Sequence, residues 1–153
     1  MRSFIFLIVI SLFSIQTIAQ ENMKEDGLKI GMCGIHVDDP VKAFKFYTEV
    51  LGFVEVMFDA KNQIALIASK LDPKGTTLLL EPTDNEIAKP YRTKIYEKGL
   101  PVIIFSCKDL QKEYERLKEA GVKFKTPPTD TEWGKIAIFD DTCGNYVQLF
   151  EEK

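Results

Sequence analysis

Three polar side chains stand in strand-like apolar segments, and each could do chemistry there. His36, the only histidine, lies in GIHV; Glu81 follows TTLLL; Gln148 lies in NYVQLFEE. Histidine titrates near neutral pH and can shuttle a proton or bind an anionic ligand. Glu81 can act as a pocket acid. Gln148 is a group facing a cavity, the remnant of one, or an exposed position on a half-buried strand.

Each of these polar residues also has a structural interpretation. His36 can end its strand with a hydrogen bond to neighbouring backbone or to the Asp38 region, and Glu81, before Pro82, can be a solvated rim carboxylate. The paired carboxylates Asp140 and Asp141 suggest acid–base chemistry. Aspartates in a turn more often bond nearby backbone amides, so we expect these two to serve the turn.

Nucleophilic chemistry has little support in the sequence. Ser106 has no base identifiable from the sequence, and the three cysteines give no basis for a thiol nucleophile, which would need a base near it. Cys33 and Cys107 lie in apolar strand patterns and Cys143 in a turn, and an odd number cannot pair completely. We expect three buried or half-buried thiols, with one disulfide plus a free thiol as the alternative.

The helices and strands that must position these residues follow a pattern that occurs twice in the chain. In 35–58 a strand end leads to Asp38 or Asp39 as helix cap, an apolar helical stripe, a glycine stop at Gly52 and a new strand. The segment 105–126 repeats this order with Asp109 as cap and a glycine stop. Three short strand-like runs follow each helix.

Each half therefore predicts a strand, a helix and three strands. We expect a single domain over 29–152, made of modules 29–82 and 100–152, with a linker 83–99 that carries a short helix around Tyr91 to Tyr96. One such half would leave a bare sheet face and open edges. Two halves can curl their sheets toward each other, with each helix on an outer face and a trough between the sheets.

Strand alternation assigns the side chains that face this trough. The expected ligand-pocket residues are Met32, His36, Leu79, Glu81, Val102, Ile104, Ser106, Tyr146 and Gln148. Trp133 joins them as a pocket wall, with ordinary packing of a large ring as the alternative. Tyr91, Arg92 and Tyr96 could close the mouth, with Arg92 drawing in an anion or facing solvent as an ordinary surface charge.

Two motifs carry a resemblance to a known family. VDDPVKAFKFYTEVLGF at 37–53 and WGKIAIFDDTCGNYVQLFE at 133–151 resemble the helix signature and closing hairpin of the vicinal oxygen chelate superfamily, although Thr142 and Cys143 replace the usual Pro-Asp type pair. Glyoxalase I, bleomycin-resistance proteins and extradiol dioxygenases belong to it. The resemblance implies an α+β fold of two βαβββ repeats forming a curled mixed sheet, and a homodimer.

Metal-dependent members of that family take two ligands from each half. The resemblance places these positions at Met32, Val102 and Gln148 and, depending on register, at Leu79 or Glu81. A thioether, aliphatic groups and a neutral amide do not suit a hard or borderline divalent ion, which prefers imidazole or carboxylate ligands. The sequence therefore predicts no metal and no cofactor, and a cup that binds a small molecule by shape.

The composition and the N-terminal segment limit which partners and compartments are possible. Twenty basic and 23 acidic residues, with a net charge of −3 and no basic run, exclude a nucleic-acid surface. Residues 1–19 have the layout of a signal peptide: Arg2, an apolar run, then small residues before a cut at Ala19–Gln20. We expect a secreted or periplasmic protein with no stable membrane span after processing; a retained N-terminal anchor is the alternative.

Three functions remain open at this point. The first is a metal-free dimer that sequesters or carries a small, partly aromatic molecule, since apolar cups with a few polar groups suit such ligands. The second is an enzyme, a glyoxalase-like lyase or isomerase using His36, Glu81 and Gln148, with or without a weakly held ion. The third is an exported dimeric scaffold.

Overall fold

The computed structural model describes residues 27–153, and the helices and strands among them run from Met32 to Glu152. The expected signal peptide at 1–19 lies outside the described residues. Within the described part of the chain, no helix is long and apolar enough to cross a membrane.

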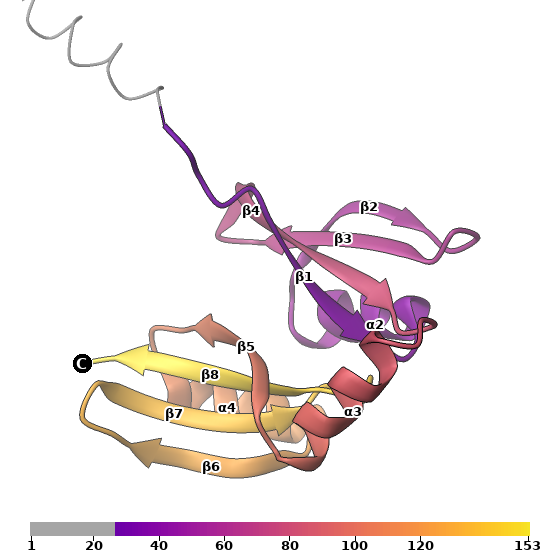
Figure 1. The fold of residues 1–153 in the computed structure, drawn as a ribbon. Coiled ribbons are helices and arrows are strands. Elements are labelled where there is room, and N and C mark those ends of the chain that lie inside the picture. The colour runs from indigo at the N-terminus through magenta and orange to yellow at the C-terminus, as the bar shows by residue number, and fades with distance from the viewer. Residues whose placement is uncertain (1–26) are drawn as a thin grey trace, which may run out of the picture. The chain divides into compact units, whose positions relative to one another are not determined.

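The first half forms a four-stranded sheet. Its elements are β1 (Met32–Val37), α2 (Pro40–Lys45), the π-helical segment η1 (Phe46–Val50), β2 (Val54–Asp59), β3 (Ile64–Ser69) and β4 (Asp72–Pro82). The strands lie in the order β1-β4-β3-β2, with β1 parallel to β4 and the other neighbours antiparallel (Figure 1). The linker carries α3 (Ala88–Glu97), which includes the predicted helical stretch.

The second half repeats this arrangement. Its elements are β5 (Pro101–Ser106), α4 (Leu110–Glu119), β6 (Phe124–Asp130), β7 (Gly134–Asp140) and β8 (Tyr146–Glu152). The strand order β5-β8-β7-β6 is the same as in the first sheet, again with the first and last strands parallel. The predicted duplication of a βαβββ unit is confirmed.

Local signals explain where the helices begin and end. Asp39 caps α2 by accepting hydrogen bonds from the amides of Val41 and Lys42, at 2.9 and 3.0 Å, and Asp109 caps α4 through the amide of Lys112. Gly52 and Gly121 follow the two helices with φ of +84° and +86°. Side chains with a Cβ rarely adopt this conformation, so glycine ends both helices as predicted.

The helices pack on one face of each sheet, and the two halves meet on that side. Phe44 of α2 stacks on Phe58 of its own sheet at 4.0 Å between ring centroids, whereas Phe46 approaches Phe139 of the second sheet at 6.4 Å. Two buried clusters, one per half, share the partly buried residues Phe46, Leu51, Ile103 and Phe105. A single core therefore joins the halves.

This packing corrects the expectation that each helix covers an outer face with a trough between the sheets. Residues 40–50 present apolar rings in more than one direction: Tyr47 packs both within its own cluster and edge-on against Phe105 of β5, at 6.3 Å. A helical segment that is apolar on more than one side is buried on more than one side. The sheet faces away from the helices remain open.

Candidate functional site

The open face of the first sheet carries the residues expected to line the cup. Ile35, Val37, Leu78 and Leu80 point into the core. Their neighbours along β1 and β4 therefore lie on the other face. In the parallel register Gly34 pairs with Leu79 and His36 with Glu81, and Met32 begins the row.

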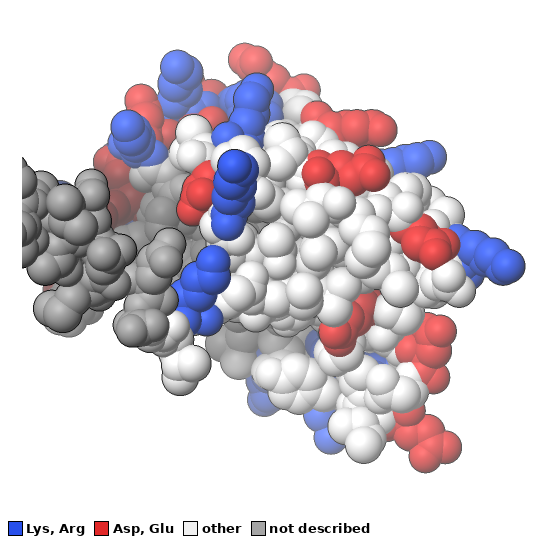
Figure 2. Space-filling view, turned by 90° about the horizontal axis from the view of Figure 1, so that it is seen from above, with Lys and Arg blue, Asp and Glu red and all other residues white. Residues whose placement is uncertain are grey.

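This face is largely apolar and uncharged. Leu66 and Met57 extend it across β3 and β2, since Leu66 pairs with both Leu79 and Met57. Figure 2 looks onto the side of the first sheet away from α2, and charged side chains lie mainly around the edge of a broad uncharged area. Met32 is 52% exposed and Met57 49%.

The open face of the second sheet is built in the same way. Val147 and Leu149 are buried against α4, so Tyr146, Gln148 and Phe150 lie on the opposite face of β8. Ile104 of β5 and Ile138 of β7 flank Gln148 on either side. Ile104 is 55% exposed, although it lies in the middle of a strand. Gln148 therefore belongs to an apolar open face, flanked by two isoleucines.

The strand register shows which residue of β4 corresponds to Gln148. In the second half, Gln148 pairs with Ile104, which lies two residues after the expected ligand position Val102. In the first half, Leu79 pairs with Gly34, which lies two residues after the equivalent position Met32. Leu79 is therefore the structural counterpart of Gln148, and Glu81 lies one pleat further along the strand. Of the two registers left open by the sequence, the structure has the one that supplies an aliphatic side chain.

The four positions do not fit a catalytic divalent ion. A methionine, a valine, a leucine and a glutamine offer one thioether and one neutral amide, whereas such an ion prefers imidazole and carboxylate ligands. Within residues 27–153 no group of three or more His, Cys, Asp or Glu side chains could hold a metal ion.

His36 and Glu81 form an acid–base pair on the open face of the first sheet. The Nδ1 atom of His36 lies 3.5 Å from a carboxylate oxygen of Glu81. Nδ1 is buried and makes no hydrogen bond to any described residue, because this contact is too long to count as one. Both side chains remain partly exposed, so the pair can reach a ligand on the sheet.

A small cavity lies beside this pair where the halves meet. Its volume is about 250 Å³, and its lining includes His36, Tyr91, Arg92, Val102 and Asn145. Tyr91 is exposed at its edge, in keeping with a residue near a cavity mouth. The cavity could hold part of a ligand that also covers the first sheet.

Arg92 was expected at a cavity mouth or in solvent, but it is buried. Its guanidinium forms an ion pair with Asp38 and donates to the carbonyl oxygen of Gly144 at 2.7 Å. Asp38 belongs to the first half and Gly144 to the second. Arg92 therefore links α3 to both halves.

Tyr96, on the same helix, donates to Asp140 at 2.6 Å and stacks on Tyr146. The hydrogen bond to Asp140 raises the pKa of Tyr96.

Asp140 and Asp141 serve the turn, as expected. Asp141 is fully buried and accepts hydrogen bonds from the amides of Cys143 and Asn145 and from the hydroxyl of Tyr47, at 2.8, 2.9 and 3.1 Å. Burial raises the pKa of Asp141, although its hydrogen bonds favour the ionised form and act to lower that pKa. Asn145 also donates to the backbone oxygen of His36 at 3.0 Å, so this turn positions the end of β1.

The remaining predicted residues lie at the margins. Trp133 precedes β7 and is 78% exposed, so it is not packed in the core. Ser106 ends β5 and is exposed. The three cysteines are free; Cys107 is half-buried and Cys143 buried, but Cys33 is exposed, which corrects the expectation for that thiol. Cys33 lies near the start of an edge strand, where little packs over it.

Two repeated βαβββ units with open apolar sheet faces define the class of protein, and comparison with known families agrees. Residues 29–149 match the Glyoxalase/Bleomycin resistance protein/Dioxygenase superfamily, and the chain belongs to it. Among curated relatives, the uncharacterized protein YurT of Bacillus subtilis is 46% identical over 127 residues, which are 82% of this chain and 100% of YurT. The uncharacterized protein YetH of the same organism is 31% identical over 127 residues, which are 80% of this chain and 98% of YetH.

Solved structures show the same fold. UcmS2 superposes with a TM-score of 0.69 at 26% identity, covering 83% of this chain and all of its own. TnmS3, described as an antibiotic binding protein from Streptomyces sp. CB03234, superposes with a TM-score of 0.63 at 24% identity, covering 83% of this chain and 98% of its own. At that identity the likeness to TnmS3 concerns the fold alone.

Proposed function

We propose that the protein binds a small, partly aromatic molecule on its open sheet faces without a catalytic metal. The observation that carries the proposal is the composition of these faces: aliphatic and aromatic side chains surround three polar groups, Gln148, His36 and Glu81. Binding sites for small molecules are typically apolar with a few polar groups that orient the ligand. The superfamily includes proteins named for resistance to bleomycin, which is consistent with such a role.

A second copy of the chain completes each cup. Met32 and Ile104 are both more than half exposed on their strands, and contiguous apolar sheet faces of this kind usually mark an interaction site. A twofold axis would set the first sheet of one copy against the second sheet of the other. Each cup would then contain His36 and Glu81 from one copy and Gln148 from its partner.

The protein is exported in this proposal. The layout of residues 1–19 supports it, and the ligand would then be met outside the cytoplasm. N-terminal sequencing of the processed protein tests this part, with a start at Gln20 expected. A retained N-terminus in a cytoplasmic fraction would refute export and leave the binding proposal in place.

Native mass spectrometry of the purified protein tests ligand binding and the dimer together. A dimer carrying a co-purifying organic molecule, with well under one metal equivalent per chain, is expected. Ile104→Glu should abolish the dimer, since burying an unpaired carboxylate in an apolar interface costs several kcal/mol. Ile87→Glu is the matched control, because Ile87 is 83% exposed and belongs to neither sheet, standing just before α3. A monomeric wild-type protein, or a dimer unaffected by Ile104→Glu, would contradict the completed cup.

A glyoxalase-like lyase or isomerase is the second candidate, favoured by the 3.5 Å contact between His36 and Glu81. Such a reaction moves a proton between neighbouring carbons, and a paired imidazole and carboxylate can carry it. Turnover of a glutathione hemithioacetal, lost in Glu81→Gln but retained in Glu86→Gln on the exposed linker, would establish the enzyme. Equal rates with and without protein would exclude that substrate.

A further inference from the structure

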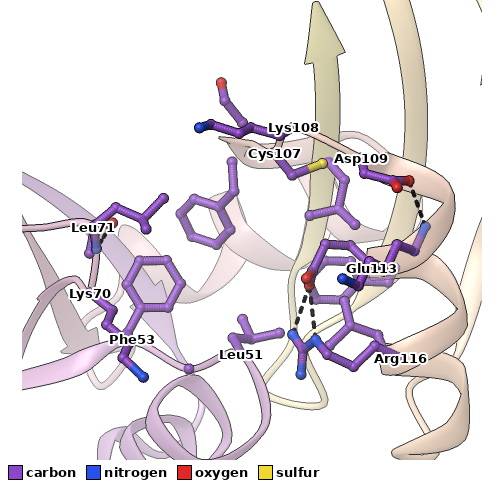
Figure 3. A pocket seen from close by; sticks show the side chains of 17 residues that line it. Leu51, Phe53, Lys70, Leu71, Cys107, Lys108, Asp109, Glu113 and Arg116 are labelled. Carbon is purple, nitrogen blue, oxygen red and sulfur yellow. Dashed lines mark hydrogen bonds and ion pairs between the residues drawn. The ribbon is translucent and has the colours of Figure 1, made fainter.

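A hollow larger than the cavity beside His36 lies away from the open sheet faces, on the helix side of the molecule. We call it the rear pocket; its lining is Leu51–Phe53, Ser69–Leu71, Phe105–Asp109, Lys112, Glu113, Arg116, Leu117, Phe139 and Leu149. The segments come from the end of η1, the β3–β4 turn, the β5–α4 connection and the first turns of α4 (Figure 3). Its volume is about 630 Å³, within the range of about 300 to 1,000 Å³ typical of small-molecule sites.

The inner wall of the rear pocket is apolar. Leu117, Phe139 and Leu149 belong to the buried core of the second half. Phe53 and Phe105 meet there with ring centroids 4.9 Å apart. Leu71, on the β3–β4 turn, is 90% exposed and adds an apolar side chain at the rim. An apolar ligand entering this hollow would therefore lie directly against the core of the protein.

The rim is positively charged. Four basic residues, Lys70, Lys108, Lys112 and Arg116, stand with two acidic ones, Asp109 and Glu113. Glu113 and Arg116 neutralise each other, since Glu113 accepts two hydrogen bonds from Arg116 at 3.0 and 2.8 Å, and Arg116 also donates to the carbonyl oxygen of Val50. Three lysines then stand against one acidic residue, Asp109. The ammonium groups of the three lysines make no hydrogen bond or ion pair with any residue from 27 to 153.

Two amide groups of the α4 N-terminus already have carboxylate partners. The amide of Leu110 donates to Glu151, and that of Lys112 donates to Asp109 at 2.9 Å. The unpaired positive charge at the rim therefore comes from lysine side chains. These can move toward a ligand, because all three are exposed.

We infer that the rear pocket binds a medium-chain carboxylate, with the alkyl chain on the apolar wall and the carboxylate among Lys70, Lys108 and Lys112. Both features are needed for this assignment: an apolar wall alone would accept any oily molecule, and lysines alone would accept any anion. Charge complementarity selects an anionic head group. The site lies within one chain and does not depend on the open sheet faces.

Titration calorimetry with decanoate and decylammonium, which share a tail and differ in head-group charge, tests the assignment on the purified protein. We expect one decanoate per chain, bound at least about ten-fold more tightly than decylammonium. The double variant Lys108→Gln/Lys112→Gln should weaken decanoate binding by about five-fold, since each exposed contact of this kind contributes modestly. The matched control Lys89→Gln/Lys94→Gln changes two exposed lysines of α3 and should leave binding unchanged.

Cys107 reports where the ligand lies. Its half-buried thiol lines the rear pocket, so saturating decanoate should slow its alkylation several-fold, while alkylation of exposed Cys33 is unaffected. Ile104→Glu, on an open sheet face, should not change decanoate affinity. Equal affinity for decylammonium, an unchanged affinity in the double variant, or an unprotected Cys107 would each overturn the assignment.

Discussion

Tyr47→Phe tests the link between the two halves. The substitution keeps the ring that packs against Phe105 and removes only the hydroxyl that donates to Asp141 at 3.1 Å. A hydrogen bond to a charged group contributes about 1.5 to 3 kcal/mol. Asp141 keeps its bonds to Cys143 and Asn145, so we expect the lower part of that range, a loss of about 1.5 to 2 kcal/mol in the free energy of unfolding at neutral pH.

The loss should depend on pH with a definite sign. Burial raises the pKa of Asp141, so the stabilisation by this residue is fully present below its ordinary pKa of 3.8 and declines as pH rises through the folded pKa. The Tyr47 hydroxyl favours the ionised carboxylate and opposes that decline. The cost of Tyr47→Phe should therefore be smaller in acid and reach its full value once Asp141 is ionised.

Urea unfolding of both proteins at several pH values between about 4 and 7 measures this effect. Tyr114→Phe is the matched control: the Tyr114 ring packs edge-on against Phe124 at 4.5 Å, and its hydroxyl makes no hydrogen bond to a described residue. A cost below about 0.5 kcal/mol for Tyr47→Phe, the same at every pH, would refute the reasoning.

Three further predictions concern single positions. Gln148→Glu should not produce stoichiometric zinc or nickel binding by elemental analysis, because the neighbouring ligand positions remain aliphatic or thioether; one equivalent of metal would contradict this. Burial raises the pKa of Cys143 to about 11, so peptide mapping after iodoacetamide treatment near pH 8 should find Cys33 modified well before Cys143, and the opposite order would be inconsistent with the buried thiol. Gly121→Ala should cost about 1 kcal/mol in thermal or urea unfolding, because φ is +86°, whereas Gly31→Ala, with open space around it, should cost much less.

The repeated unit was predictable because its signals are local. An aspartate cap, an apolar stripe and a glycine with positive φ lie within about four turns of one another in each half, and strand alternation assigned Gln148 to the face opposite Val147 and Leu149. The faces of the strands could therefore be assigned before any tertiary structure was known.

What could not be predicted depends on contacts distant in sequence. Arg92 was expected at the surface or at a cavity mouth, yet it is held by Asp38 and Gly144, which lie 54 and 52 residues away. Nothing near Arg92 in the sequence indicates these partners. The predicted side on which the halves meet was also wrong. Phe46, which approaches Phe139 of the second sheet, lies outside the apolar stripe that predicted the helix: Val41, Phe44, Tyr47, Val50 and Leu51. The rear pocket combines six separate stretches of the chain and has no motif of its own.

The shared residues Phe46, Leu51, Ile103 and Phe105 have a consequence for how the chain loses its structure. Two similar modules on one polypeptide could in principle unfold one after the other, as independent domains do. Here the disruption of either module would strip apolar contacts from its neighbour, so heating should give a single calorimetric transition. A fragment ending in the linker would contain all strands of the first module but would lack the residues of the second module that complete the shared core, so it should not fold by itself.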